Sequence, residues 1–165
     1  MVKLKTIIII LAAAGLGLFA FYRYYQSDES RINRQFKRLA EWGSKESGEQ
    51  NLSMAVRVKK LETLFGKECR VEAPEYSRSK TYAPSEIGNI ARMAAGKYTA
   101  IGIRFLDLNI SVENRTAASV CTVRISTLQP GGEAIESVQE VECILKKTGQ
   151  EWLFHEIKLV DVLEK

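Results

Sequence analysis

An uninterrupted apolar run at the start of the chain, residues 6–25, constrains the fold more than any other feature. Arg23 is the single charged residue in this run, and it lies near the end. As a helix the run would be about 30 Å long, which is the thickness of the hydrocarbon core of a bilayer. The sequence therefore predicts a transmembrane anchor over residues 1–26, followed by one domain over residues 27–165.

A cleaved secretory signal is the main alternative for this segment. Cleavage after Ala20 would place Leu18 where a small residue is preferred, and the apolar run is longer than a signal peptide needs. Arg23 instead lies among tyrosines at positions 22, 24 and 25, a pattern typical of the membrane interface. A buried core helix is disfavoured because no polar stripe interrupts the run. We predict an uncleaved signal anchor.

Basic residues lie on both sides of the predicted span. Lys3 and Lys5 favour a cytoplasmic N-terminus, whereas the positive-inside rule applied to the cluster after the span would place the domain in the cytoplasm. Because a very short tail with leading lysines is usual for a signal anchor, we expect a single-pass protein with its domain on the periplasmic side of a bacterial inner membrane. The cluster itself predicts either contact with anionic headgroups or a solvated helix face, and it consists of Arg31, Arg34, Lys37 and Arg38.

Composition excludes several classes of function. The net charge of +4 is mild and spread along the 165 residues, so the chain has no nucleic-acid-binding footprint. Three cysteines without metal-ligand spacing and a single histidine make a zinc site improbable. We expect no metal and no cofactor. About 140 residues after the anchor suffice for one domain with a core.

The remainder of the chain predicts an α+β domain. Helical periodicity covers residues 31–44, 52–65 and 84–96, with Gly66 as the C-cap of the second helix and Pro84 at the start of the third. A weak hairpin lies at 69–82. Alternation with a period of two then predicts four long strands linked by hairpins, over residues 98–112, 116–128, 136–147 and 151–162.

Two of these strands carry informative patterns. In the first long strand, Ile103 and Phe105 alternate in one phase and Leu108 and Ile110 in the opposite phase, which predicts a β-bulge near Asp107. In the last strand, an alternating apolar set predicts the core-facing side, with Trp152 and Phe154 on the opposite side. That set consists of Leu153, His155, Ile157 and Leu159.

The order of elements resembles the nuclear transport factor 2-like superfamily, also called cystatin-like or cone-shaped α+β. The resemblance rests on Ile32-x-x-x-Phe36-x-x-Leu39, Leu61-x-x-Leu64-Phe65, Pro84-Ser-Glu-Ile-x-x-Ile90 and the closing Lys147-Thr-Gly-Gln-Glu-Trp-Leu-Phe-His155. It implies three helices packed on a curved antiparallel sheet of four long strands plus a short hairpin, with a pocket between the two layers. Members of this superfamily include isomerases, dehydratases, cyclases and membrane-anchored scaffolds, so the fold alone does not define a function.

The predicted interior contains one candidate for chemistry. His155 alternates with apolar residues, so we consider it both as a weak catalytic acid–base candidate and as a satisfied core histidine. A ligand pocket inside the cone would be lined by Ile103, Phe105, Val123, Leu145 and His155.

A second question concerns Cys121 and Cys143. A turn centred near Gly132 would place them opposite each other on one face, as a disulfide pair or as two small buried apolar residues. Cys69 would remain unpaired.

Three functions follow from these features. We predict a membrane-tethered, non-enzymatic interaction or scaffold domain, binding the bilayer through residues 6–25 and a protein partner or second copy through the sheet face, where Trp152 and Phe154 would form an apolar patch. The alternatives are a cone that binds a small ligand or lipid, and an isomerase or cyclase that uses His155.

Overall fold

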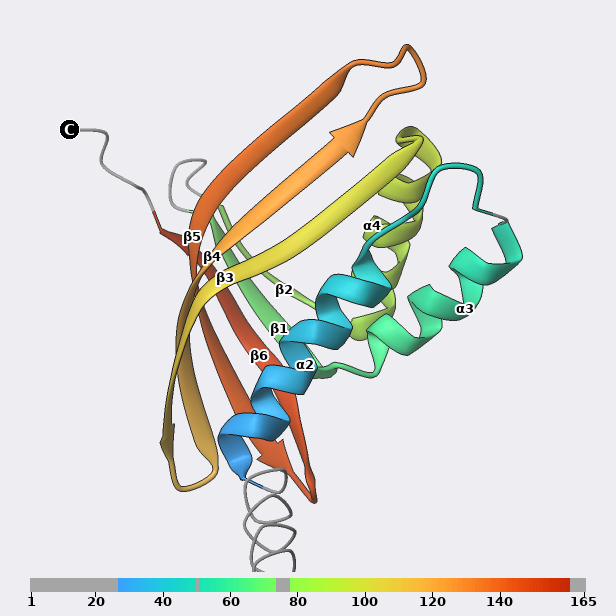
Figure 1. The fold of residues 1–165 in the computed structure, drawn as a ribbon. Helices are drawn as coiled ribbons and strands as arrows, with labels where there is room; N and C mark the ends of the chain where they lie inside the picture. Colours follow the sequence, from blue (N-terminus) through green and yellow to red (C-terminus); the bar gives the residue numbers. More distant parts are fainter. Residues whose placement is uncertain (1–26, 50, 74–77, 161–165) are drawn as a thin grey trace, which may run out of the picture.

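The computed structural model describes residues 27–49, 51–73 and 78–160. The predicted anchor, residues 6–25, lies outside these described residues. Within the described ranges, no helix has the length and apolar character needed to cross a membrane. The described part is α+β, with three helices lying on one side of a curved sheet of six strands (Figure 1). We call the side of the sheet that the helices cover the inner face, and the opposite side the outer face.

Helix α2 (Asp28–Gly43) begins three residues earlier than its apolar pattern predicts. The Ser27 side chain caps the helix by accepting a hydrogen bond from the Ser30 amide at 3.2 Å. Asp28 in the first turn is favoured by the positive end of the helix dipole. Ile32 and Phe36 are buried on the side that faces the sheet, so the predicted amphipathic helix is confirmed.

The second helix, α3 (Asn51–Glu62), is shorter than predicted, and the third, α4 (Pro84–Lys97), starts at Pro84 as expected. Strand β1 (Phe65–Ala73) pairs with β2 (Arg78–Tyr82) and forms the predicted short hairpin. Phe65 and Gly66 thus belong to β1, and Gly66 does not cap the helix. The apolar pair Leu64-Phe65 continued the helical pattern across the boundary, which is why the sequence placed the helix end too late.

The sheet is mixed rather than wholly antiparallel, which corrects one part of the predicted fold. Its strand order is β2-β1-β6-β5-β4-β3, and β1 runs parallel to β6. The other neighbouring pairs are antiparallel. The four long strands of the predicted meander are β3 (Ala100–Glu113), β4 (Thr116–Leu128), β5 (Ala134–Thr148) and β6 (Glu151–Val160).

Two bulges set which side chains reach the core. In β3 the pairing with β4 shifts between Leu106 and Asn109, and Asp107 has a φ of 52°, which confirms the predicted bulge. In β6 the pairing with β5 shifts between Phe154 and Glu156, a bulge that the sequence analysis missed. Each bulge inserts one extra residue into its strand. The residues that face inward therefore switch between odd and even numbers at the bulge.

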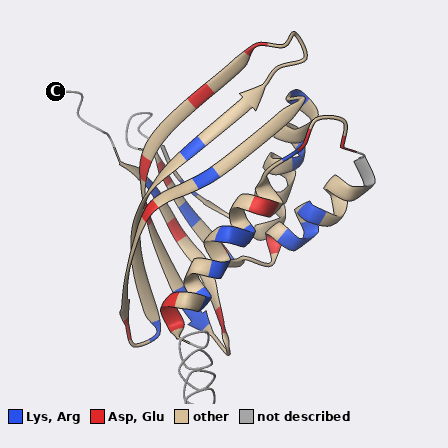
Figure 2. Cartoon of the chain, viewed as in Figure 1, with Lys and Arg blue, Asp and Glu red and all other residues tan. Residues whose placement is uncertain are grey.

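Charged side chains are spread over the helices and strands (Figure 2). The main core lies between α2 and the inner face, and it includes fully buried residues from both layers. These are Ile32, Leu64, Cys69, Ala117, Leu145, Trp152 and Phe154.

Candidate functional site

Aromatic side chains pack between α2 and the inner face of the sheet. Phe36 makes edge-to-face contacts with Phe105 and Phe154, each with ring centroids 5.1 Å apart. Trp152 and Phe154 are fully buried. Of the predicted pocket-lining residues, Val123 and Leu145 are members of this core, and Ile103 and Phe105 pack against it. The structure therefore brings these four residues together around a packed interior.

The buried polar side chains of this interior are satisfied by backbone oxygens. Gln35 Nε2 donates to the Trp152 carbonyl at 2.7 Å, and Ser119 Oγ donates to the Cys143 carbonyl at 3.3 Å. Across the described ranges, no buried side-chain nitrogen or oxygen lacks a hydrogen-bond partner. Both contacts are neutral hydrogen bonds that tie elements together, and neither pairs two groups that exchange a proton near neutral pH.

His155 does not join the predicted pocket. It is the extra residue of the β6 bulge, between Phe154 and Glu156. With Glu156 it lines a shallow outer-face recess that also includes Arg70, Ile144 and Lys146. Burial, together with the nearby Lys146 charge, lowers the pKa of His155. The imidazole is thus neutral at pH 7, and it lies on the opposite side of the sheet from the interior.

His155 also packs closely on Gly66 of β1. A Cβ added to Gly66 would lie 2.6 Å from both Cε1 and Nε2 of the imidazole. Such a distance is too short for two carbon or nitrogen atoms, so a side chain at position 66 would have to displace the imidazole. His155 thus packs at the parallel β1–β6 junction.

Trp152 and Phe154 form no exposed patch, which corrects the predicted interaction surface. The β6 bulge explains the error. Before the bulge, Trp152 and Phe154 point inward, and after it Ile157 and Leu159 do so. The alternation of Leu153, His155, Ile157 and Leu159 predicted one uninterrupted inner face, which placed the two aromatic residues on the wrong side.

The register between β4 and β5 differs by two residues from the predicted one. Cys121 pairs with Val141, and Cys143 pairs with Ser119, so the two cysteines are diagonal neighbours rather than opposite each other. All three cysteines are free and buried. Burial raises the pKa of Cys69 to about 12 and that of Cys121 to about 11, and it raises the pKa of Cys143 further. These thiols are thus unreactive in the folded state.

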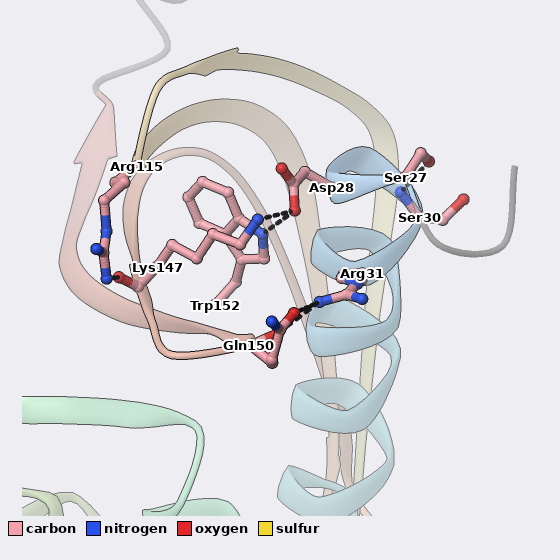
Figure 3. Close-up of polar contacts among 8 residues, drawn as sticks. All are labelled: Ser27, Asp28, Ser30, Arg31, Arg115, Lys147, Gln150 and Trp152. Carbon is pink, nitrogen blue, oxygen red and sulfur yellow. Dashed lines mark hydrogen bonds and ion pairs between the residues drawn. The ribbon is translucent and has the colours of Figure 1, made fainter. Parts of the chain in front are cut away.

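A polar cluster joins the start of α2 to the β5–β6 turn (Figure 3). Asp28 Oδ1 accepts hydrogen bonds from Lys147 Nζ at 2.7 Å and from Trp152 Nε1 at 3.0 Å. The hydrogen bond from Lys147 holds the pKa of Asp28 below its ordinary value, although partial burial opposes this shift. Arg115 Nη2 donates to the Lys147 carbonyl at 3.0 Å and brings in the β3–β4 turn. The cluster thus fixes three chain segments at the end of the domain that follows the predicted anchor.

Beside this cluster lies a recess of about 290 Å³ with a basic wall. Three arginines of α2 form the wall, Gln150 comes from the β5–β6 turn, Glu151 and Trp152 come from the start of β6, and Gln35 is also part of the lining. We call this the arginine recess, and its arginines are Arg31, Arg34 and Arg38. Their spacing of three and four residues places them along one side of the helix. The sequence predicted these residues only as a basic cluster, because Gln150, Glu151 and Trp152, which complete the recess, lie more than 100 residues away.

The outer face carries a small group of exposed aliphatic side chains. Leu106 is paired with Thr122, and Val120 lies two residues from Thr122 on the same side of β4. Val138 on β5 is paired with Arg124, the next residue on that side of β4. We call Leu106, Val120 and Val138 the outer aliphatic patch. Ion pairs lie near it, including Arg124–Glu136 and Lys158–Glu142.

The described residues contain no group of three or more His, Cys, Asp or Glu side chains that could hold a metal ion. A further recess, of about 300 Å³, lies between α2 and the edge strand β3, and its lining includes Phe36, Ile103, Phe105 and Leu108. This recess is the structure's nearest equivalent to the predicted ligand pocket, since it includes two of the predicted residues.

Comparison with solved structures identifies the fold. A protein from Kribbella flavida superimposes with a TM-score of 0.69 at 14% identity, covering 84% of this chain and 93% of that one. An NTF2-like protein with a cystatin-like fold from Novosphingobium aromaticivorans gives a TM-score of 0.64 at 12% identity, covering 90% of each chain. A proposed dehydratase of the NTF2-like family from Streptomyces avermitilis gives 0.66 at 14%, covering 83% of this chain and 98% of that one.

No family model matches the sequence, and no curated protein matches it. At such low identities, similarity to solved structures establishes the NTF2-like fold and leaves the function open.

Proposed function

We propose that this NTF2-like chain is a membrane-tethered, non-enzymatic interaction domain that associates with a second copy of itself through its outer face. The filled interior of the cone is the observation that supports this most strongly. Phe36 contacts Phe105 and Phe154 between α2 and the sheet, Trp152 is fully buried in the same core, and the space left open there is the recess at the β3 edge. A protein whose interior is packed in this way binds its partners with its surface.

The outer aliphatic patch is the surface that favours a second copy. Its three side chains are exposed on neighbouring strands, and both signs of charge surround them. A two-fold symmetric contact needs a self-complementary surface, which exposed aliphatic side chains interspersed with acidic and basic neighbours supply. Residues 6–25 support the tether through their length and composition. The domain would lie on the periplasmic side of a bacterial inner membrane.

A matched pair of valines tests this proposal. Val138 in the patch and Val56 on α3 are each 51% exposed. The molar mass of the full chain in a neutral detergent, measured by light scattering after gel filtration, should correspond to a dimer for the wild type and for Val56→Lys. Val138→Lys should weaken dimerisation at least 10-fold, because it buries a charge at the contact. A monomeric wild type, or a dimer that Val138→Lys leaves unchanged, would contradict the proposal.

A second function, binding of a small apolar ligand, is favoured by the recess between α2 and β3. Ala40 lines that recess, so Ala40→Phe would fill it. If this function is correct, a fluorescent apolar probe should bind the wild type, and Ala40→Phe should abolish that binding without changing the molar mass.

A further inference from the structure

We infer that the arginine recess binds a phosphate group. The wall of the recess places three guanidinium groups against one carboxylate, that of Glu151. Guanidinium stays charged at all physiological pH values, and its planar donors match the oxygens of phosphate. At about 290 Å³ the recess has the size of a small ligand site.

Two of the arginines are held by neutral acceptors. Arg31 Nη1 donates to the carbonyl oxygen of Gln150 at 2.9 Å and to its Oε1 at 2.8 Å. Arg38 Nη1 donates to Gln35 Oε1 at 3.4 Å, and its guanidinium lies 5.9 Å from the centre of the Trp42 ring. These contacts orient the two side chains, and Arg31 also lies close enough to Asp28 for its charge to lower the pKa of that carboxyl. Arg31 and Arg38 each keep further N–H donors for a ligand.

The base of the recess is rigid. Gln35 is buried and donates to the Trp152 carbonyl at 2.7 Å, while its Oε1 accepts from Arg38. A single buried amide thus links the helix, the start of β6 and one arginine of the wall. This arrangement reduces the entropy lost on binding, because the wall is already ordered.

Two sources of phosphate fit this location. Helix α2 rises 1.5 Å per residue, so Arg31 lies roughly 6 Å along the helix from Ser27, the residue that follows the predicted anchor. That distance is similar to the thickness of the headgroup layer, about 5–7 Å on each side of a bilayer. A lipid headgroup would therefore reach the recess if the anchor spans the membrane, whereas a soluble phosphate would reach it in any case.

The test compares two variants with equal loss of charge. Arg34→Gln/Arg38→Gln removes two charges from the recess, and Arg92→Gln/Lys97→Gln removes two from α4, on the opposite side of the helix layer. The full chain is held in neutral detergent, and its unfolding temperature is measured with inorganic phosphate at constant ionic strength. A second set of samples uses micelles doped with phosphatidylglycerol or with phosphatidylcholine.

Each outcome is decisive. A rise of about 4 °C at ten times the Kd, lost in the recess variant and kept in the α4 variant, supports the site. A rise with inorganic phosphate identifies a soluble ligand, and a rise confined to the micelles doped with phospholipid identifies a headgroup. Equal rises in the unfolding temperature of both variants would show that the phosphate effect does not depend on the arginine recess. No rise in the wild type with either probe would overturn the inference. Neither result depends on the dimer, because the outer face is unaltered.

Discussion

At the residue scale, Asp28 has the most connected side chain at the end of the domain next to the predicted anchor. One of its oxygens accepts from both Lys147 and the indole of Trp152, which is fully buried. The ion pair is partly exposed, so its own contribution is small, about 0–1 kcal/mol. The hydrogen bond to Trp152 matters more, because a buried N–H without an acceptor costs about 1–3 kcal/mol.

Two substitutions at Asp28 separate these contributions. Asp28→Asn keeps an acceptor for Trp152 and should lower the free energy of unfolding by less than about 1 kcal/mol. Asp28→Ala leaves the indole unpaired and should lower it by about 2 kcal/mol. Urea denaturation followed by tryptophan fluorescence measures both. Equal losses in the two variants would show that the ion pair dominates.

The ion pair between Asp28 and Lys147 also predicts that the free energy of unfolding depends on pH. The pKa of Asp28 is lower in the folded state than in the unfolded chain, so its charge stabilises the fold above the unfolded value of about 3.9. This stabilisation is lost as the pH falls through the folded pKa. The difference between the wild type and Asp28→Asn should therefore be constant near neutral pH and disappear in acid. A difference that persists at about pH 2 would contradict this assignment.

The contact between Gly66 and His155 can be tested in the same way. Gly66→Ala forces a Cβ against the imidazole and should cost about 1–3 kcal/mol. His155→Ala removes the obstacle, so the double variant should recover most of that loss in a double-mutant cycle. Additive losses would mean that the two residues are not coupled. Such a result would remove the packing role that we assign to His155.

At the scale of elements, the two bulges determine which face each half of a strand presents. Asp107 and His155 are both extra residues, so deleting either leaves an unbroken alternation of inward and outward side chains. Deleting a regularly paired residue such as Arg104 instead turns one half of β3 over, because facing alternates at every residue.

This difference predicts opposite effects of two single-residue deletions in β3. The chain lacking Asp107 should remain folded, with the cooperative denaturation of the wild type. The chain lacking Arg104 should lose more than about 4 kcal/mol, because Ile103 and Phe105 can no longer both face the core. Circular dichroism during urea denaturation measures both, and equal effects would contradict the role of the bulge.

Sequence periodicity predicted the elements well where one face carries one kind of residue. The β3 bulge was found because apolar residues occur in both phases around Asp107. The β6 bulge was missed because Leu153 and Ile157 share a phase and conceal the change. The parallel pairing of β1 with β6, and the partners of Asp28, join residues far apart in the chain, and such contacts leave no local pattern. The sequence predicted the arginines of the recess only as members of a basic cluster.

At the scale of the whole molecule, the domain has a packed core, and we assign binding roles to two of its surfaces. The outer face would contact a second copy, and the arginine recess would lie next to the membrane. Both surfaces depend on where the predicted anchor places the domain, which an experiment on the intact chain can establish.

Fusion of alkaline phosphatase to the C-terminus tests the orientation. Because this enzyme is active only after its disulfides form outside the cytoplasm, an active full-length fusion in bacterial membranes is expected. The size of the membrane-bound product should correspond to the uncleaved chain. A stable but inactive fusion would place the domain in the cytoplasm, and a shortened product would indicate a cleaved signal.

Cross-linking at Thr122 is the most direct test of the central claim, since this residue lies within the outer aliphatic patch. The three native thiols are buried, so a cysteine introduced by Thr122→Cys is the one exposed to a short bis-maleimide in intact membranes. We predict a covalent dimer for Thr122→Cys and none for Met93→Cys, on the exposed surface of α4. Equal yields at both positions, or no dimer at Thr122→Cys, would contradict association through the outer face.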